Sequence, residues 1–564
     1  MFTVVWALVA EPKAWAQAPD WQAVAGISGP VGNGSQIKAA TTDASGNVYM
    51  VGTFAGKAGF GSITLTSERN SIFVAKWSPA AGRFLWVQQA QGFLDNEATA
   101  ITLNGNDIYI AGQFASSTIT FGSIVLSSTS VDYTTDGFVA KLTEQGGTAR
   151  FVWAERIGGT RGQYITAVAC VGSSVYVAGH TNGDKAQFGA FTFRNASSDT
   201  YTTDAFVAKL TDAGTTASFT WVQYLSGSDF DQADALVTEG NSVYFAVTSS
   251  SPTLAIGNKV FSSAGGSDVF VVRLTDTGTT SNVSWTQQLG GTGVDRARAL
   301  ALSGANLYLA GSSSSFQLPF GSSSSSPAGS YDVMVAKLTQ AGAPVWIARG
   351  GGAGEESAYA LAVSGSNVYV AGYLASTTAR FGTTSLARTG AHSSMGTELF
   401  VARLTDAGAT GDFTWARKAD GSGSSNYAYA VAVSGANVYV AGQIEAFNTF
   451  GSLPVSTGGG TRRGFLALLA DATPTTDTKT LLSEVSLYPN PARTSVTMQL
   501  PLIPKATPVV FKLLNTVGQV VRTRALTLTN GLRPELHLAG LAAGHYTLLL
   551  EADGQWAAHS LIVY

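Results

Sequence analysis

The stretch that decides the fold is "AYAVAVSGANVYVAG", residues 428–442, which is typical of two short strands joined by a tight turn. The segments before and after "SGAN" consist mainly of small and β-branched residues, as expected for strands, and Gly and Asn are favoured in the tight turn between them. A near copy, "SGSNVYVAG", occurs at 364–372. The tyrosine phrase recurs seven times, centred on Tyr49, Tyr109, Tyr176, Tyr244, Tyr308, Tyr369 and Tyr439. Such a period indicates a repeat architecture.

Two further phrases recur with the tyrosine phrase. One resembles "DxFVAKL" and is centred on Phe73, Phe138, Phe206, Phe270, Met334, Phe400 and Phe465. The other carries Trp21, Trp86, Trp153, Trp221, Trp285, Trp346 and Trp415. With an alanine-rich strand before each tyrosine phrase, every repeat predicts four antiparallel strands. Four-stranded sheets stacked face to face in a ring form a β-propeller, so we predict an all-β, seven-bladed propeller over residues 19–470.

The order of the phrases predicts how the ring closes. The last repeat ends at 464–470 without a tryptophan strand, whereas the tryptophan strand at 20–26 precedes every other phrase. We therefore expect the N-terminal strand to complete the seventh blade. The alanine-rich strands also align at one small residue, as crowding near the axis requires: Ala40, Ala100, Ala167, Ala235, Ala299, Ala360 and Ala430.

These phrases, taken together, resemble a bacterial β-propeller repeat family. The resemblance covers residues 19–470 and implies the fold, but it implies no ligand, because propellers serve many functions.

Composition argues against nucleic-acid binding and against a membrane span, and the N-terminal residues indicate export. Charged residues make up 12% of the chain, and the formal net charge is −3. The sequence lacks the basic stripe that is typical of nucleic-acid-binding proteins. No run of 18 or more apolar residues indicates a membrane span. An apolar stretch at 2–10 followed by "AQA" at 16–18 predicts a signal peptide over residues 1–18. We expect a monomer.

The composition changes after the threonine-rich segment 471–482, which we interpret as a linker. Short strands separated by Pro and Gly turns over 483–564 predict an immunoglobulin-like antiparallel β-sandwich. This region is similar to the C-terminal sorting domain of the type IX secretion system. The matching motifs, "YPNP", "GQVV" and "LAAGHYTLLL", contain Tyr488, Pro489, Asn490, Pro491, Gly518, Gly544 and Tyr546. The resemblance implies a Gram-negative bacterium, the type IX machinery as a partner, and a protein that is secreted or attached to the outer surface.

One set of polar residues is a candidate binding site. The start of each alanine-rich strand carries an acid or an amide: Gln36, Asn96, Gln163, Asp231, Asp295, Glu356 and Asn426. We predict that these side chains form a ring at one mouth of the axial channel. Asp231, Asp295 and Glu356 come from consecutive blades, and oxygen ligands of this kind suit Ca²⁺. The alternative is that each residue caps its own turn. No other cofactor is expected.

A second set is basic: Lys76, Lys141, Lys209, Arg273, Lys337 and Arg403. Each lies five residues after a Ser, Asp or Glu, and we expect ion pairing between adjacent blades.

The sequence thus predicts an exported, non-enzymatic binding or adhesion module for a glycan or a protein that it does not identify. The alternatives are a secreted enzyme acting on polysaccharide and a passive structural spacer.

Overall fold

The computed structural model describes residues 18–564 except 129–133, 195–201, 226, 319, 321–327, 390–395, 459–460, 472–484, 500–506, 517–518, 529–533 and 553–554. The chain divides into two compact units, residues 1–471 and 472–564. The described residues are all-β, and none of them form a helix that could cross a membrane. The expected signal peptide and the expected linker beyond residue 471 lie outside the described residues.

Within the described part of the N-terminal unit, seven antiparallel meanders of four strands repeat. Their strands are given below from the inner strand outward. Meander 1 contains β2 (Ser35–Thr42), β3 (Val48–Phe60), β4 (Ile63–Ser78) and β5 (Arg83–Gly92). Meander 2 contains β6 (Asn96–Asn104), β7 (Asp107–Phe114), β10 (Asp136–Gln145) and β11 (Thr148–Gly159). Meander 3 contains β12 (Gln163–Val171), β13 (Ser174–Asn182), β16 (Thr203–Asp212) and β17 (Ala217–Leu225).

The remaining four meanders follow the same plan. Meander 4 contains β18 (Asp231–Glu239), β19 (Ser242–Ser249), β22 (Asp268–Asp276) and β23 (Ser281–Leu289). Meander 5 contains β24 (Asp295–Ser303), β25 (Asn306–Ser313), β26 (Asp332–Thr339) and β27 (Pro344–Gly352). Meander 6 contains β28 (Glu356–Ser364), β29 (Asn367–Leu374), β32 (Glu398–Asp406) and β33 (Gly411–Lys418). Meander 7 contains β35 (Tyr427–Ser434), β36 (Asn437–Glu445), β39 (Arg462–Ala470) and β1 (Trp21–Gly26).

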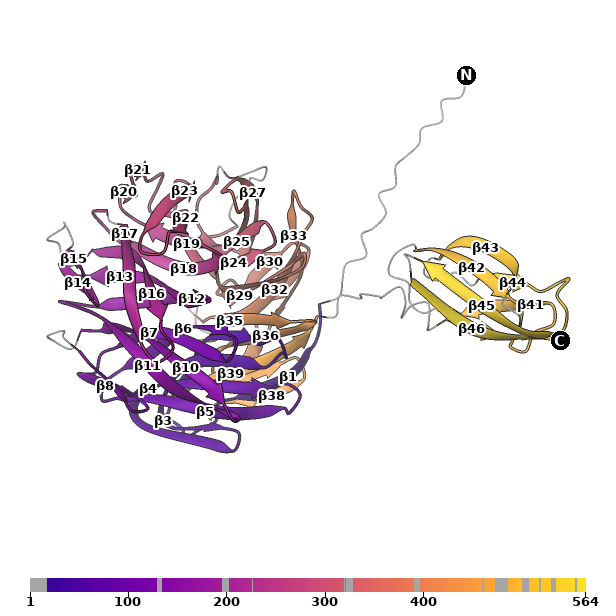
Figure 1. The fold of residues 1–564 in the computed structure, drawn as a ribbon, viewed down its shortest axis with the longest axis horizontal. Coiled ribbons are helices and arrows are strands. Elements are labelled where there is room, and N and C mark those ends of the chain that lie inside the picture. Colours follow the sequence, from indigo (N-terminus) through magenta and orange to yellow (C-terminus); the bar gives the residue numbers. More distant parts are fainter. Residues whose placement is uncertain are drawn as a thin grey trace, which may run out of the picture. The chain divides into compact units, whose positions relative to one another are not determined.

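The inner strands lie around a common axis, and β6, β12, β18 and β35 can be found near the middle of the unit in Figure 1. Each inner strand contacts the inner strand of the next meander, and β35 contacts β2. The arrangement is therefore propeller-like. Apolar clusters fill the space between neighbouring meanders, such as the one that combines Ile37 and Val48 with Tyr439 and Leu466.

Each inner strand carries a bulge at the same point, as between Ala98 and Ala100 in β6. The residue opposite the bulge is Gly in six meanders; a Cβ on Gly112, for example, would lie 2.0 Å from the Glu97 carbonyl oxygen. The close backbone approach therefore requires glycine there.

Short hairpins connect the meanders further. They are β8–β9 (Thr118–Phe121, Ile124–Ser127), β14–β15 (Lys185–Phe188, Phe191–Arg194), β20–β21 (Thr253–Ile256, Lys259–Ser262), β30–β31 (Thr378–Phe381, Thr384–Ala387) and β37–β38 (Phe447–Phe450, Leu453–Ser456). Three of them pair with the outer strand of the preceding meander, through β5, β11 and β27. The hairpin β37–β38 pairs with β34 (Asp420–Gly421).

A buried carboxylate joins neighbouring meanders at five junctions. At the junction of meanders 3 and 4, Asp276 accepts hydrogen bonds from Lys209 Nζ at 2.6 Å, Tyr176 Oη at 2.6 Å and Trp221 Nε1 at 3.1 Å. Burial acts to raise the pKa of Asp276, but these donors outweigh it and hold the pKa below its usual value. We call this arrangement of Tyr, base, Trp and carboxylate a junction cluster.

The other carboxylates of junction clusters are Glu144, Asp212, Asp406 and Asp471, which pair with Lys76, Lys141, Lys337 and Arg403. In the last of these clusters, the Trp415 indole N–H has no hydrogen-bond partner among the described residues. The expected pairing of bases between adjacent blades is thus found for these residues. The acids five residues before the bases are not the partners in these pairs. At the junction of meanders 4 and 5, Gln340 replaces the carboxylate and accepts from Trp285 through its main-chain oxygen. Asp471, which we assigned to the linker, instead belongs to this unit and is 5% exposed.

The described part of the C-terminal unit contains two antiparallel sheets. One consists of β40 (Ser486–Tyr488), β41 (Ser495–Gln499) and β44 (Glu535–His537), and the other of β43 (Val520–Leu528), β42 (Thr507–Leu514), β45 (Gly544–Ala552) and β46 (Gln555–Val563). Both contribute to one apolar core that includes Val496, Leu536, Phe511 and Leu548.

Candidate functional site: the axial cavity

The acid and amide side chains at the start of the inner strands are buried, so the prediction that they ring an open mouth is wrong. Asp231 and Asp295 are both 0% exposed. Asp231 accepts hydrogen bonds from the hydroxyls of Ser249 and Ser251, at 2.5 and 3.1 Å. These serines belong to, or directly follow, the second strand of the same meander, so the carboxylate fixes local structure.

Other members of this set act in the same way. Asp295 accepts from Ser315 Oγ and Gly291 N at 2.7 and 2.9 Å, and Glu356 accepts from Gly352 N at 2.7 Å and Ser376 N at 2.9 Å. Asn96 and Asn426 also bond to nearby main-chain groups. Among the described residues, the buried Gln163 amide has no hydrogen-bond partner. The turn-capping alternative therefore describes most of these residues.

Gln36 does not belong to the set, which corrects the alignment of the first repeat. Ser35 pairs with Phe54, just as Asn96 pairs with Phe114, so Ser35 occupies the equivalent position. The turn between Thr42 and Val48 is one residue longer than the turn between Leu103 and Ile108, which shifts the register by one. Since successive strand residues face opposite sides, Gln36 faces away from the position we assigned to it.

The three carboxylates proposed for Ca²⁺ are not brought together. Asp231, Asp295 and Glu356 are held within separate meanders by the hydrogen bonds above. The part of the chain that the structure describes contains no group of three or more His, Cys, Asp or Glu residues able to hold a metal ion. The expectation of a shared Ca²⁺ site on these three residues is therefore wrong.

Buried carboxylates do meet in pairs at the junctions. Thr203 forms a parallel bridge with Phe230, and this bridge places Asp204 of meander 3 near Asp231 of meander 4. Burial, together with the charge of Asp231, raises the pKa of Asp204 to about 7. Burial also raises the pKa of Asp231, to about 6, although the serine hydroxyls oppose this shift.

The pair predicts a pH dependence of stability. Because the folded-state pKa values lie above the ordinary value of 3.8, the folded protein binds more protons than the unfolded chain, and stability is lost as pH rises through the folded pKa. The denaturant midpoint of the N-terminal unit should therefore fall between about pH 5 and 8. Asp204→Asn should flatten this slope, whereas Asp412→Asn, at an exposed position of β33, should leave it unchanged. Parallel pH profiles for Asp204→Asn and the parent would contradict the assignment.

A cavity of about 240 Å³ lies on the axis and is lined by all seven inner strands. The side chain three residues after each buried polar position lines it. We call these the axial residues: Lys38, Thr99, Thr166, Asp234, Arg298, Tyr359 and Tyr429. In every meander, the residue directly before the axial residue is buried. Because successive residues of a strand face opposite sides, the axial residue faces the cavity.

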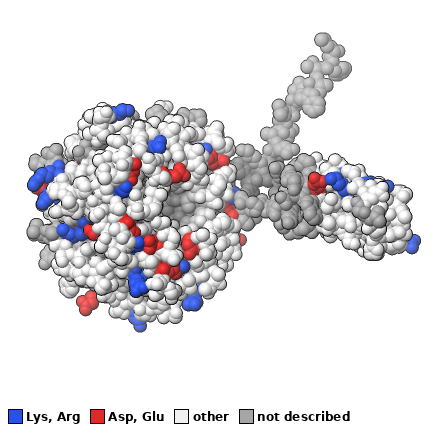
Figure 2. Space-filling view, viewed as in Figure 1, with Lys and Arg blue, Asp and Glu red and all other residues white. Residues whose placement is uncertain are grey.

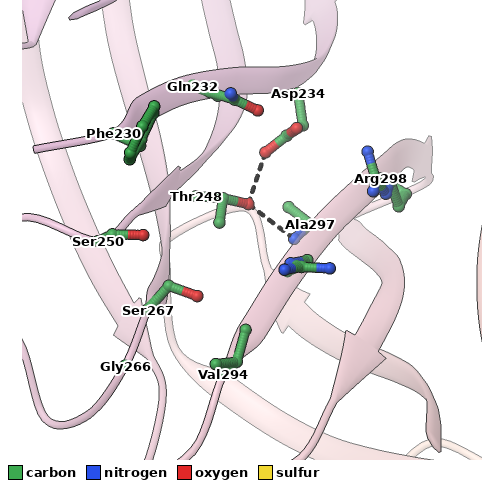
Figure 3. Close-up of a pocket in the computed structure, with 11 residues that line it drawn as sticks. Phe230, Gln232, Asp234, Thr248, Ser250, Gly266, Ser267, Val294, Ala297 and Arg298 are labelled. Carbon is green, nitrogen blue, oxygen red and sulfur yellow. Dashed lines mark hydrogen bonds between the residues drawn. The ribbon is translucent and has the colours of Figure 1, made fainter. Parts of the chain in front are cut away.

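A second cavity, of about 320 Å³, adjoins the first, because Asp234 and Arg298 line both. Figure 3 shows Thr248 between Asp234 and the main chain of Ala297. Thr248 donates to Asp234 at 2.6 Å and accepts from Ala297 N at 3.0 Å. Burial raises the pKa of Asp234 to about 6, although Arg298 and Thr248 oppose this shift. The hydroxyl thus fixes the Asp234 carboxylate across the junction of meanders 4 and 5.

Tyr359 and Tyr429 form the part of the cavity wall that follows Arg298, and Tyr373 and Tyr427 pack against them. Tyr359, Tyr373, Tyr427 and Tyr429 pack with ring centroids 5.4–6.2 Å apart, and all are half-buried. The Arg298 guanidinium lies 5.4 Å from the centre of the Tyr359 ring. On the far side, Lys38 lies 4.8 Å from the centre of the Tyr429 ring and pairs with Glu97 at 2.8 Å. The two tyrosines therefore lie side by side in the ring of axial residues, between Arg298 on one side and Lys38 on the other.

The sequence prediction missed the axial residues, although a signal was present. At this position the repeats carry Lys, Thr, Asp, Arg or Tyr, while the residue after it is alanine in every meander. Variation at one fixed structural position is typical of a surface that serves binding rather than folding. Acidic and basic side chains are also interspersed over the face shown in Figure 2.

The sorting-motif residues lie in the C-terminal unit. Asn490 donates to the Ser560 carbonyl at 2.7 Å and accepts from Ile562 N at 2.9 Å, so "YPNP" is held against the last strand, β46. Tyr488 is 75% exposed, and Pro489 and Pro491 each follow a cis peptide bond. Gly544 begins β45, and Tyr546 donates to the Ala542 carbonyl at 2.8 Å. Gly518 lies outside the described residues.

Solved structures that resemble the chain do so weakly. The phage phi92 endosialidase is 10% identical, with 96% of this chain and 88% of that chain covered and a TM-score of 0.38. The quinohemoprotein alcohol dehydrogenase of Comamonas testosteroni is 10% identical, with 74% of each chain covered and a TM-score of 0.32. PorZ, a surface component of the type IX secretion system of Porphyromonas gingivalis, is 11% identical, with 96% and 100% covered and a TM-score of 0.14. None of these similarities is close enough to assign a function.

No curated protein sequence matches the chain. Residues 486–564 match the family model of the secretion system C-terminal sorting domain. This match confirms the resemblance predicted from "YPNP" and the two motifs that follow it. The C-terminal unit is therefore a sorting domain that interacts with the type IX secretion machinery, and the protein is exported, to be secreted or attached to the outer surface of a Gram-negative bacterium.

Proposed function

We propose that the N-terminal unit is a closed, seven-bladed β-propeller that acts as a monomeric binding or adhesion module outside the cell. Its ligand is a glycan or a protein, and binding takes place in the axial cavity without catalysis. Each meander is one blade in this proposal, and β1 closes the ring by pairing with β39.

The observation that carries the proposal is the set of axial residues. One position of a repeated strand is occupied by a lysine, an aspartate, an arginine and two tyrosines, and all of these line one cavity. A concave site that combines aromatic surface with a few polar groups is the usual form of a ligand site. The neighbouring positions of the same strands are small and apolar and serve packing.

Glycan-array binding by the full chain tests the proposal. Tyr359→Ala combined with Tyr429→Ala should lower the array signal about tenfold or more, because the rings supply the aromatic wall of the cavity. Phe191→Ala is the matched control, since Phe191 is 38% exposed on the hairpin β14–β15 outside the cavity lining.

Two alternatives predict different results. Product formation from a panel of polysaccharides would establish an enzyme instead of a binding module. A chain that binds no member of a glycan array or an extracellular protein panel would be a spacer.

A further inference from the structure

We infer that the cavity at β24 binds an acidic saccharide, whose carboxylate is held by Arg296 and Arg298 while its sugar ring lies against Tyr359 and Tyr429. The inference rests on the proposed binding function and specifies the class of ligand.

The first observation is that both arginines are available to a ligand. They are two residues apart on β24, so they face the same side of the strand, and both are exposed and line the 320 Å³ cavity. Among the described residues, neither forms a direct ion pair with a carboxylate, although the charge of Asp234 in the same cavity interacts with both. Instead, their guanidinium groups lie 5.4 Å from the centres of the Tyr331 and Tyr359 rings.

The bases of the five junction clusters differ from these two arginines. Lys76, Lys141, Lys209, Lys337 and Arg403 are each paired with the carboxylate of their cluster. Arg296 and Arg298 have no such partner, although only 12% of the residues of the chain are charged. Their two guanidinium groups therefore leave ten N–H donors in a concave site available to a ligand. The planar guanidinium matches a carboxylate through two parallel hydrogen bonds, and stacking on tyrosine limits its motion.

Asp234 gives the site a direction. It lines the same cavity as the arginines, but Thr248 holds it by a 2.6 Å hydrogen bond toward β19. Its carboxylate can accept hydrogen bonds from ligand hydroxyls while the arginines bind the acid group. A molecule with hydroxyl groups on one side and a carboxylate on the other satisfies both.

The shape of the site favours a saccharide over an acidic peptide. An extended peptide is bound along a strand edge or in a groove. The axial cavity is instead lined by side chains from seven different strands. Such a cavity suits a compact cyclic group, and the half-buried tyrosines offer it flat apolar faces.

Calorimetric titration of the full chain tests the inference. The probes are a hyaluronan tetrasaccharide, its carboxyl-reduced form and a hexaglutamate peptide. We expect binding of the acidic tetrasaccharide, weakened about 10- to 100-fold by carboxyl reduction and by Arg296→Gln with Arg298→Gln, because two charge-assisted bonds are lost. Arg296→Lys with Arg298→Lys should recover part of the affinity, since it keeps the charge but not the fork. Arg83→Gln with Arg150→Gln is the charge-matched control, because both arginines are exposed and lie outside the cavity lining.

The outcomes separate this inference from the proposed function. Equal binding of the acidic and reduced tetrasaccharides, undiminished binding by the glutamine variant, or binding of hexaglutamate alone would overturn the acidic-saccharide assignment. If neutral glycans bind and depend on Tyr359 and Tyr429, the binding function stands without it. If no glycan binds on the array or in solution, the acidic-saccharide assignment fails, and the binding function fails with it only when no member of the extracellular protein panel binds either.

Discussion

Asp276→Ala should destabilise the N-terminal unit by about 3–5 kcal/mol, because it removes one partner of a buried ion pair. The Asp276 and Lys209 side chains are each 7% exposed, so water cannot replace the lost partner. The substitution also leaves Tyr176 and Trp221 without their acceptor. Guanidinium unfolding followed by tryptophan fluorescence measures the change.

Gln340→Ala is the matched control for this prediction. Gln340 occupies the equivalent place at the next junction, but it accepts from Trp285 through its main chain, and its side chain makes exposed contacts. Loss of the Gln340 side chain should lower the free energy of unfolding by less than about 1 kcal/mol. Asp276→Asn, which keeps the shape and removes the charge, should fall between the two. Equal midpoints for Asp276→Ala and Gln340→Ala would refute a stabilising role of the carboxylate.

Removal of β1 should make the protein aggregate. β1 pairs with β39 from Trp21 opposite Leu469 to Gly26 opposite Phe465, so its loss exposes the hydrogen-bonding edge of β39. Trp21 also packs edge-on against Phe450 at 5.0 Å, and its loss opens an apolar pocket. Removing a buried Trp side chain alone costs about 3–5 kcal/mol.

Two chains that differ only in this strand provide the comparison, one beginning at Pro19 and the other at Ile27. Light scattering during size-exclusion chromatography should show a monomer for the first and large species for the second. The synthetic peptide 20–26, added during refolding, should restore part of the monomer. A chain beginning at Ile27 that stays monomeric and keeps the parent's denaturant midpoint would show that β1 does not close a ring.

The repeat phrases predicted the strands because each phrase carries its own local pattern of apolar residues and turns. The tryptophan strand at the N-terminus was likewise assigned to the last repeat, since only that repeat lacked a fourth strand. Register was less accessible. Aligning the first repeat by its tyrosine selected Ala40, whereas the longer turn makes Ala39 the equivalent residue. A one-residue difference in a turn moves every side chain of a strand to the other face.

The candidate site could be predicted only in part, for a related reason. Acids and amides at the start of the inner strands were visible in the sequence, but whether they face the cavity or the space between sheets depends on the bulge. The junction clusters show a second limit. Lys209 and Asp276 are distant in sequence, and only the packing of one meander on the next brings them to 2.6 Å.

The position of β39 has a mechanical consequence for a protein attached to a surface through its C-terminal unit. β39 lies between β36 and β1, and Asp471, which follows it directly, is held by Arg403 and Tyr369. A force applied along β39 would load the hydrogen bonds on both of its sides together, in shear, rather than open them one at a time. The strand that leads to the C-terminal unit is therefore held on both sides against such a load.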